Sequence, residues 1–240
     1  MTEQKTTQKI LIAGFGGQGV LFLGKWIAYA GVIREKQVSW LPSYGPEMRG
    51  GTANCSVIVS GEPIGSPIVS EPDVLIAMNL PSFLAYQGSV CAGGEIIYDA
   101  SLIHEQPARK DVRYRAINAT RLASDAGLDG LGNMILLGAF LEDCLPMTWA
   151  MCSQVLSQVV PAHKKHLIEA NMRALMLGRE HAARCEDATS KMPRHPLRAV
   201  KLTGKQAVLQ NKAIYRLYCM RHKNPLTNGI IADIMQKNHI

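Results

Sequence analysis

The sequence predicts an α/β fold: a three-layer α/β/α domain with a mostly parallel or mixed central sheet, a helical C-terminal part and a basic extension. Two observations lead to this prediction. Short apolar runs alternate with amphipathic stretches up to about residue 116, and three helix-like stretches then follow one another. A change of composition near residue 184 sets the boundaries, so we expect a domain at residues 8–183 and an extension at residues 184–240.

Strands are expected where a short apolar or alternating run is bounded by turn residues. Ile10–Ala13 and Val74–Met78 are continuous apolar runs, which are typical of strands covered on both faces. Ala53–Ser60 alternates instead, so one face of that strand is predicted to be buried. The remaining expected strands are Val38–Leu41, Ile96–Tyr98 and Val112–Ala116.

Helices are expected where apolar residues recur at helical spacing. Val20–Ala30 has a broad apolar face directly after the first strand, and Gly31 is predicted to end this helix. A short helix is also plausible over Lys205–Arg221, although its apolar face is too small to be stable alone. The other expected helices are Asn133–Glu142, Thr148–Val160 and Ala162–Arg179.

Composition indicates a soluble globular protein. The chain has 240 residues, of which 47% are hydrophobic, enough for one sizeable core. No apolar run reaches the roughly 18 residues of a membrane span, and the polar start lacks the apolar core of a signal peptide, so we expect a cytoplasmic location. The six cysteines form no CxxC pair, which favours buried free thiols over a zinc site, an iron–sulfur cluster or a disulfide framework.

The net charge of +7 comes from the end of the chain. Residues 184–240 hold 11 basic and 3 acidic residues, whereas residues 1–183 hold 15 and 16. A basic extension could bind nucleic acid, but a solvated surface is the commoner explanation for such a charge run. Nucleic acid is therefore not an expected partner of the main domain.

A glycine-rich turn follows the first strand. The segment KILIAGFGGQG runs from Lys9 into Gly14, Gly16 and Gly19, and a helix is expected immediately afterwards. Glycines at this point allow a tight turn, bring backbone N–H groups close to a phosphate, and start a helix whose positive dipole end faces the anion. A turn with a purely structural role is the alternative.

The same spacing is found in dinucleotide-binding proteins, so a stand-alone NAD(P)- or nucleotide-binding oxidoreductase of Rossmann-like fold is an alternative function. Such a site also needs an acidic residue at the end of the second strand to hold the ribose hydroxyls. Here that strand is followed by Pro42, and Glu35 precedes it. The missing acid disfavours the dinucleotide alternative.

A second unusual loop, Pro42–Thr52, joins two expected strands with two prolines and three glycines. It exposes one acid, Glu47, and one guanidinium, Arg49. If the flanking strands neighbour the first strand, the loop lies beside the glycine turn. Arg49 could then pair with a phosphate or carboxylate of a ligand, or it could instead contact Glu47 and hold the loop together.

Several motifs in order resemble the gamma subunit of 2-oxoacid:ferredoxin oxidoreductases, over about residues 8–183. They are GFGGQG, SYGPEMRGGTANCSVIVS, PIGSPIV, PDVLIAMN, GNMILLGAFLE and EANMRALMLG. YGPEMRGGTAN is the specific signal among them. The resemblance is greatest to the 2-oxoglutarate and 2-oxoisovalerate enzymes.

The resemblance implies a non-catalytic subunit that is inactive alone. Enzymes of this family oxidatively decarboxylate a 2-oxoacid, transfer electrons to ferredoxin and release an acyl-CoA. The resemblance implies alpha, beta and ferredoxin-like delta partner subunits, which carry thiamine diphosphate, magnesium and the iron–sulfur clusters. In agreement, the chain offers no metal site and no acid, base and nucleophile set that would define a catalytic centre.

The resemblance also implies that this subunit contributes to assembly and to the coenzyme A site. We expect the backbone amides of the turn to face a coenzyme A phosphate and the Gln18 side chain to add a hydrogen bond. The residues expected to bind coenzyme A are Gly14, Gly16, Gly17, Gln18, Gly19 and Arg49. The residues expected to line the same loop or contact a partner subunit are Tyr44, Glu47, Gly50, Gly51 and Thr52.

Overall fold

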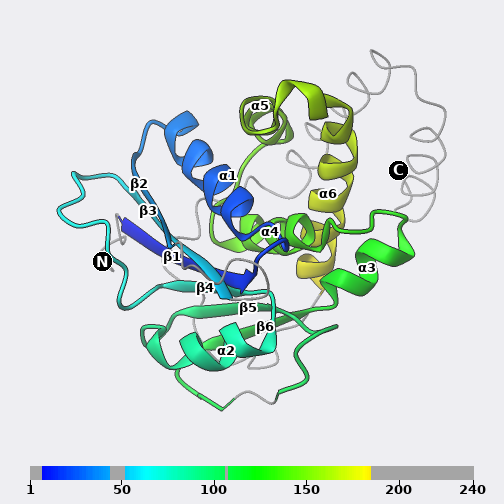
Figure 1. Ribbon diagram of the computed structural model, residues 1–240. Coiled ribbons are helices and arrows are strands. Elements are labelled where there is room, and N and C mark those ends of the chain that lie inside the picture. The colour runs from blue at the N-terminus through cyan, green and yellow to red at the C-terminus, as the bar shows by residue number, and fades with distance from the viewer. Residues whose placement is uncertain (1–6, 44–51, 106–107, 185–240) are drawn as a thin grey trace. The chain divides into compact units, whose positions relative to one another are not determined.

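The computed structural model describes residues 7–43, 52–105 and 108–184 of the chain (Figure 1). Its strands are β1 (Thr7–Phe15), β2 (Gln37–Ser43), β3 (Thr52–Ser60), β4 (Val74–Ala77), β5 (Glu95–Asp99) and β6 (Arg113–Ile117). Its α-helices are α1 (Val20–Ile33), α2 (Leu80–Tyr86), α3 (Ala119–Asp125), α4 (Gly132–Asp143), α5 (Trp149–Val159) and α6 (Ile168–Arg184). Two 3₁₀ helices, η1 (Gln87–Ser89) and η2 (Ala162–Leu167), complete these elements. All six predicted strands are present.

The strands form one mixed sheet in the order β2-β3-β1-β4-β5-β6. The strands β1, β4, β5 and β6 are parallel, whereas β3 is antiparallel to both β1 and β2. The carboxyl ends of β1, β4 and β5 therefore meet at one edge of the sheet, and the antiparallel β3 begins at that same edge. This edge carries the glycine turn.

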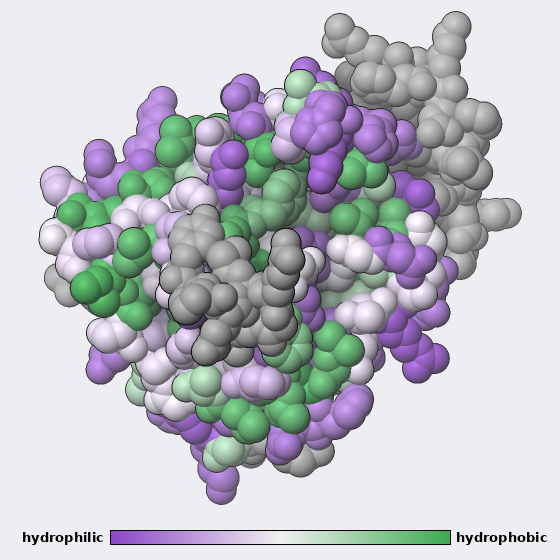
Figure 2. All heavy atoms as spheres, in the orientation of Figure 1, coloured by the Kyte–Doolittle hydropathy of each residue, from purple (hydrophilic) through white to green (hydrophobic). Residues whose placement is uncertain are grey.

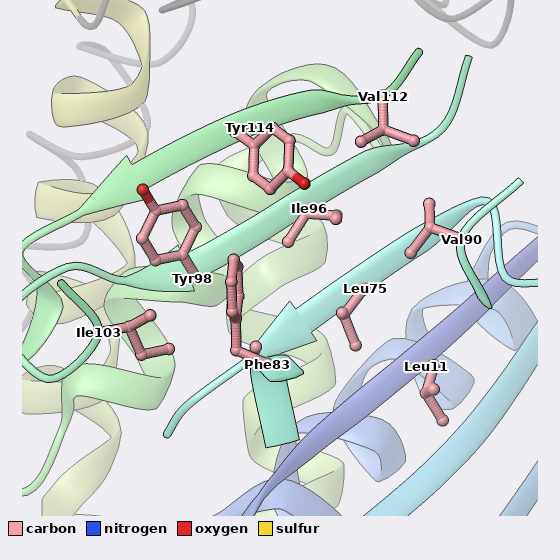
Figure 3. Packing of buried hydrophobic residues seen from close by; sticks show 10 residues of the cluster. Leu11, Leu75, Phe83, Val90, Ile96, Tyr98, Ile103, Val112 and Tyr114 are labelled. Carbon is pink, nitrogen blue, oxygen red and sulfur yellow. The ribbon is translucent and has the colours of Figure 1, made fainter. Parts of the chain in front are cut away.

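Helices cover both faces of the sheet, as the prediction of three layers requires. Figure 1 shows α2 on one side of the sheet and α1 with α4 on the other. Phe83 of α2 packs against two tyrosines of the sheet (Figure 3). Its ring centroid lies 5.2 Å from that of Tyr98 and 6.2 Å from that of Tyr114. On the other face, α1 buries Leu23 and Trp26 completely. The two apolar layers explain why strand β4 is apolar along its whole length.

The structure corrects two predicted helices and adds two that were not predicted. The first helix does not end at Gly31 but continues to Ile33, and the left-handed residue after it is Glu35, with φ 56°. Gly31 serves close packing instead, because a Cβ there would lie 2.6 Å from Cγ2 of Val38. The predicted helix Ala162–Arg179 is a 3₁₀ helix followed by α6, and the short helices α2 and α3 were not predicted.

Helices α4 and α6 cross with their backbones in contact. A Cβ on Gly138 would collide with the Leu175 carbonyl oxygen, and a Cβ on Gly178 would collide with the carbonyl oxygen of Ile135. Glycine at both positions is what allows this close approach, since any side chain would separate the helices.

A buried ionic cluster joins the sheet to the end of α4. Glu95, only 1% exposed, lies 2.9 Å from an Nη of Arg113 and 2.8 Å from an Nη of Arg115. Arg115 also pairs with Asp143. Burial alone lowers the pKa of Arg115, but the negative charges of Glu95 and Asp143 outweigh it and raise that pKa overall. The cluster lies at the amino ends of β5 and β6, away from the glycine turn.

Candidate binding site at the carboxyl ends of the strands

The glycine turn has the backbone that its sequence predicts. Gly17 and Gly19 have φ values of 99° and 82°, a region that residues with a Cβ rarely adopt. Gly14 is still within β1, where a Cβ would lie 2.9 Å from Cβ of Met78. The glycines thus have separate roles: Gly14 allows close strand packing, and Gly17 and Gly19 form the turn.

Helix α1 starts directly after this turn. Its N-cap residue is Gly19, which has no side chain to accept a hydrogen bond from the first-turn amides. Among the residues described, the amides of Gly16, Gly17 and Gly19 donate to no acceptor. The Gln18 amide is different, because it donates to the Phe15 carbonyl at 3.2 Å and closes the turn. Of the four amides expected to face a ligand, those of Gly16, Gly17, Gln18 and Gly19, the Gln18 amide is thus already used within the turn.

The Gln18 side chain holds the turn in place. Its Oε1 accepts from the Phe15 amide at 2.6 Å and from Asn79 Nδ2 at 3.3 Å, and its Nε2 donates to the Met78 carbonyl at 3.0 Å. Asn79 in turn caps α2 by accepting from the Ser82 amide at 2.8 Å. The side chain that was expected to contact the ligand thus bridges the ends of β1 and β4. Only its second Nε2 hydrogen is not used in these bonds and could be donated to a ligand.

The position that a Rossmann-like fold gives to its second parallel strand is occupied by the antiparallel β3. At the edge that holds the turn, β3 presents its first residues and not its carboxyl end. The strand next to β1 on this side therefore offers no acid at a carboxyl end for a ribose. The architecture does not support the stand-alone dinucleotide-binding alternative.

The register of β3 places the last residue of the second loop beside the turn. Thr52, the first residue of β3, pairs with Phe15, the last residue of β1. The loop therefore ends next to the turn, as expected if the strands were neighbours. The predicted site residues Tyr44, Glu47, Arg49, Gly50 and Gly51 lie outside the residues that the structure describes.

A cavity of about 290 Å³ opens beside the turn. Gly17 and Gln18 form one wall, and the starts of α3 and α4 form the other. Asp99, at the end of β5, lies in the lining but is already satisfied: it accepts from the Thr120 hydroxyl at 2.5 Å and from the Thr120 amide at 3.1 Å. This carboxylate therefore anchors α3.

Asn133 connects the second wall of the cavity to the turn. A Cβ on Gly19 would collide with Nδ2 of Asn133, so the amide lies directly over this glycine. Its Oδ1 accepts from the Met134 amide at 2.8 Å. Sequence reasoning did not identify Asn133, Asn79, Asp99 or Thr120 as site residues. Two signals were available: Asn133 belongs to the GNMILLGAFLE motif, and Asn79 precedes a helix with Pro81 in its first turn.

The cysteines among the described residues are free thiols. Burial raises the pKa of Cys55 and of Cys152 to about 12, and it raises that of Cys144 well above the ordinary value. These three thiols are protonated at neutral pH and are not nucleophiles. Within the same part of the chain, no three His, Cys, Asp or Glu side chains gather in a way that could hold a metal ion.

The protein is thus a three-layer α/β domain with a mixed sheet, and its candidate site is a glycine turn with an adjoining cavity at the carboxyl ends of the parallel strands. The chain belongs to the pyruvate ferredoxin/flavodoxin oxidoreductase family, whose model matches residues 9–181. None of the helices in the described part of the chain has the length and apolar character needed to cross a membrane.

Relatives of known name agree with this family. The chain is 37% identical over 174 residues to ketoisovalerate oxidoreductase subunit VorA of Methanothermobacter thermautotrophicus, covering 72% of this chain and 36% of the relative. It is 33% identical to 2-oxoglutarate synthase subunit KorC of Methanothermobacter marburgensis, covering 72% of this chain and 95% of the relative. The chain thus spans about a third of the ketoisovalerate subunits that it matches and nearly all of this KorC.

Solved structures share the fold. The gamma subunit of keto/oxoacid ferredoxin oxidoreductase from Geobacter sulfurreducens superposes with a TM-score of 0.64 at 27% identity, covering 74% of this chain and 97% of that one. The 2-oxoglutarate:ferredoxin oxidoreductase of Magnetococcus marinus, solved with 2-oxoglutarate, coenzyme A and succinyl-CoA bound, gives 0.68 at 23% identity. That match covers 80% of this chain and 34% of that chain, and it shows likeness of fold alone.

Proposed function

We propose that the chain is a gamma-type subunit of a multi-subunit 2-oxoacid:ferredoxin oxidoreductase. The complex would convert a 2-oxoacid, either 2-oxoglutarate or 2-oxoisovalerate, to acyl-CoA and CO2 and reduce ferredoxin. The relatives with these two substrates in their names support this choice.

Catalytic cofactors are assigned to partner subunits in this proposal. Thiamine diphosphate, magnesium and iron–sulfur clusters would lie on alpha, beta and ferredoxin-like delta subunits. The dispersed cysteines of the sequence and the raised pKa values of Cys55, Cys144 and Cys152 support this division. The chain itself would bind and orient coenzyme A and would be inactive alone.

The coenzyme A site is proposed at the glycine turn and the second loop. The pairing of Thr52 with Phe15 is the observation that carries this proposal, because it brings the end of the loop to the start of the turn. The amides of Gly16, Gly17 and Gly19 would donate to a phosphate at the positive end of α1. Arg49 would add a charge-assisted pair from the loop.

A role in assembly is proposed alongside ligand binding. Leu84 of α2 is 51% exposed, and Ile68, in the loop between β3 and β4, is 70% exposed. Figure 2 shows apolar side chains gathered over α2 and over that loop. Exposed apolar patches of this kind are typical of contacts with other subunits.

The test replaces Arg49 by alanine in the assembled complex. We expect the KM for coenzyme A to rise about tenfold or more, because a charge-assisted contact with a phosphate is lost, while the KM for the 2-oxoacid stays nearly unchanged. Steady-state kinetics with each substrate varied in turn measure both constants.

Lys110→Ala is the matched control. Like Arg49→Ala, it removes one positive charge. Lys110 is exposed and lies just before β6, at the edge of the sheet opposite the turn. An Arg49→Ala complex that is intact and has an unchanged KM for coenzyme A would contradict the ligand role and leave only the assembly role.

A further inference from the structure

The 3₁₀ helix η2 forms a corner of the molecule that has no role in the proposed coenzyme A site. It connects α5 to α6 and packs against α6 (Figure 1). Every residue from Pro161 to Leu167 is exposed, so this η2 corner has no buried face. A helix of this kind gains little stability from packing, and all of its side chains are available to contact another molecule.

Hydrogen bonds hold the backbone of the η2 corner in one shape. The Lys164 amide donates to the Pro161 carbonyl at 2.8 Å, which closes the first turn. From α6, the buried Asn171 donates through its Nδ2 to the Leu167 carbonyl at 2.7 Å. The exposed side chains therefore project from an ordered backbone, so a partner that binds them loses little conformational entropy from this chain.

The charge of the η2 corner has one sign. Figure 2 shows hydrophilic side chains gathered over it, and four consecutive ones are basic: His163, Lys164, Lys165 and His166. None of these four makes a side-chain hydrogen bond or an ion pair with another residue in the described ranges. No acidic residue occurs between Asp143 and Glu169, whereas residues 1–183 as a whole hold 16 acidic and 15 basic residues. The corner is therefore a basic point on a domain that is otherwise slightly acidic.

A protein surface with clustered carboxylates fits the η2 corner better than a nucleic acid does. Binding of nucleic acid relies on a series of phosphate contacts and, for single strands, on aromatic side chains that stack on the bases. The corner offers two lysines, and its other exposed residues besides the histidines are aliphatic: Pro161, Ala162 and Leu167. A small apolar surface bordered by charged groups is instead the arrangement found at protein–protein interfaces.

We propose that the η2 corner docks onto an acidic surface of a partner subunit. Carboxylates of that subunit accept hydrogen bonds from the ammonium groups of Lys164 and Lys165, and the same contact covers Leu167. The inference rests on the proposed function, which supplies the partner subunits. It adds a charged contact on the opposite side of the sheet from the exposed apolar residues of α2 (Figure 1). Attraction between opposite charges speeds association, and it weakens as salt is added.

The first experiment assembles the full-length chain with the subunits that carry thiamine diphosphate and iron–sulfur clusters, and treats the complex with a carbodiimide. This reagent joins an amine directly to a carboxylate in contact with it. We expect mass spectrometry to find Lys164 or Lys165 joined to an Asp or Glu of a partner subunit. Lys36 and Lys110 are the controls, because each is exposed and has an acidic residue of this chain as its sequence neighbour. An intact complex in which the η2 lysines form no more links to partner subunits than the controls do would overturn the proposal.

The second experiment reverses the charge of the corner by combining Lys164→Glu with Lys165→Glu. We expect association with the partner subunits to weaken about tenfold or more at low ionic strength, and the difference to shrink as salt is added. Folding should be unaffected, because η2 buries no side chain. Lys36→Glu combined with Lys110→Glu changes the net charge equally, and this control should associate like the unaltered chain.

The possible outcomes separate this inference from the proposed function. Equal association by a folded η2 variant would refute the docking role. Failure of the unaltered chain to join the partner subunits would count against the proposed function itself. Labelled polyuridylate that binds the unaltered chain and the control but not the η2 variant would overturn the choice of an acidic protein in favour of nucleic acid.

Discussion

At the scale of single residues, Gln18 determines the shape of the candidate site. Its three side-chain hydrogen bonds reach the Phe15 amide, the Met78 carbonyl and Asn79. These partners come from the ends of two adjacent parallel strands, where a ligand often enters an α/β sheet. The glutamine occupies that gap, so the proposed coenzyme A site lies on the turn itself and not between the two strand ends.

We predict that Gln18→Ala lowers the free energy of unfolding by about 1–3 kcal/mol, because two backbone groups lose their partners. The same change should raise the KM for coenzyme A in the assembled complex, since the turn would no longer be held in one conformation. Chemical denaturation of the chain and steady-state kinetics of the complex measure the two effects.

Gln158→Ala serves for comparison, since Gln158 is exposed on α5. A Gln18→Ala variant that is as stable as this control would show that the observed hydrogen bonds contribute little. A loss of stability with an unchanged KM for coenzyme A would show that these hydrogen bonds stabilise the fold but do not affect ligand binding.

At the scale of elements, the close crossing of α4 and α6 fixes the position of α4 in the helical layer. Gly138 and Gly178 bring the two backbones into contact, and α4 also begins at the cavity with Gly132 and Asn133. The position of Asn133 over Gly19 therefore depends on a helix that is held from behind by α6.

We predict that Gly138→Ala destabilises the domain by about 1–3 kcal/mol or more, because the methyl group collides with the Leu175 carbonyl oxygen and the helices must separate. Gly88→Ala is the control, since a Cβ at that position has open space around it. Thermal or urea unfolding of both variants measures the difference. Equal stabilities would mean that α6 moves away at little cost.

The elements predicted from the sequence are those with strong local patterns. All six strands and helices α1, α4 and α5 follow from apolar runs or helical spacing. Helices α2 and α3 have seven residues each, too short for a periodic pattern to stand out. Gly31 was predicted to end a helix because glycine often does so, but its role depends on Val38 and Val59, which only the folded sheet brings near.

At the scale of the whole molecule, the site was predicted in part. The turn could be found because glycine spacing after a strand is a local signal, and its position at a helix start is confirmed. The cavity could not, because its walls join residues 17 and 133, which are far apart in the sequence. The hydrogen bonds of the Gln18 side chain could not be predicted either, since its partners Met78 and Asn79 lie at the end of a different strand.

The domain boundary proposed near residue 183 can be tested by truncation. A chain ending after Arg184 should unfold cooperatively, with nearly the same denaturation midpoint as the full chain, because the sheet and both of its layers are formed by residues 7–184. Urea unfolding followed by circular dichroism compares the two chains. A truncated chain that is insoluble or much less stable would move the boundary into the extension.

The bridge made by Gln18 has a consequence for how the protein matures. Two of its hydrogen bonds reach Met78 and Asn79, which lie 60 and 61 residues downstream, just after β4. A nascent chain that has made only the first helix therefore lacks these two bonds, although the local bonds between Gln18 and Phe15 can form. A ligand that binds the turn only when all of these bonds are formed therefore binds the folded domain and not its folding precursors. By thermodynamic linkage, such a ligand stabilises the whole folded domain by an amount that grows with the ratio of its concentration to its Kd.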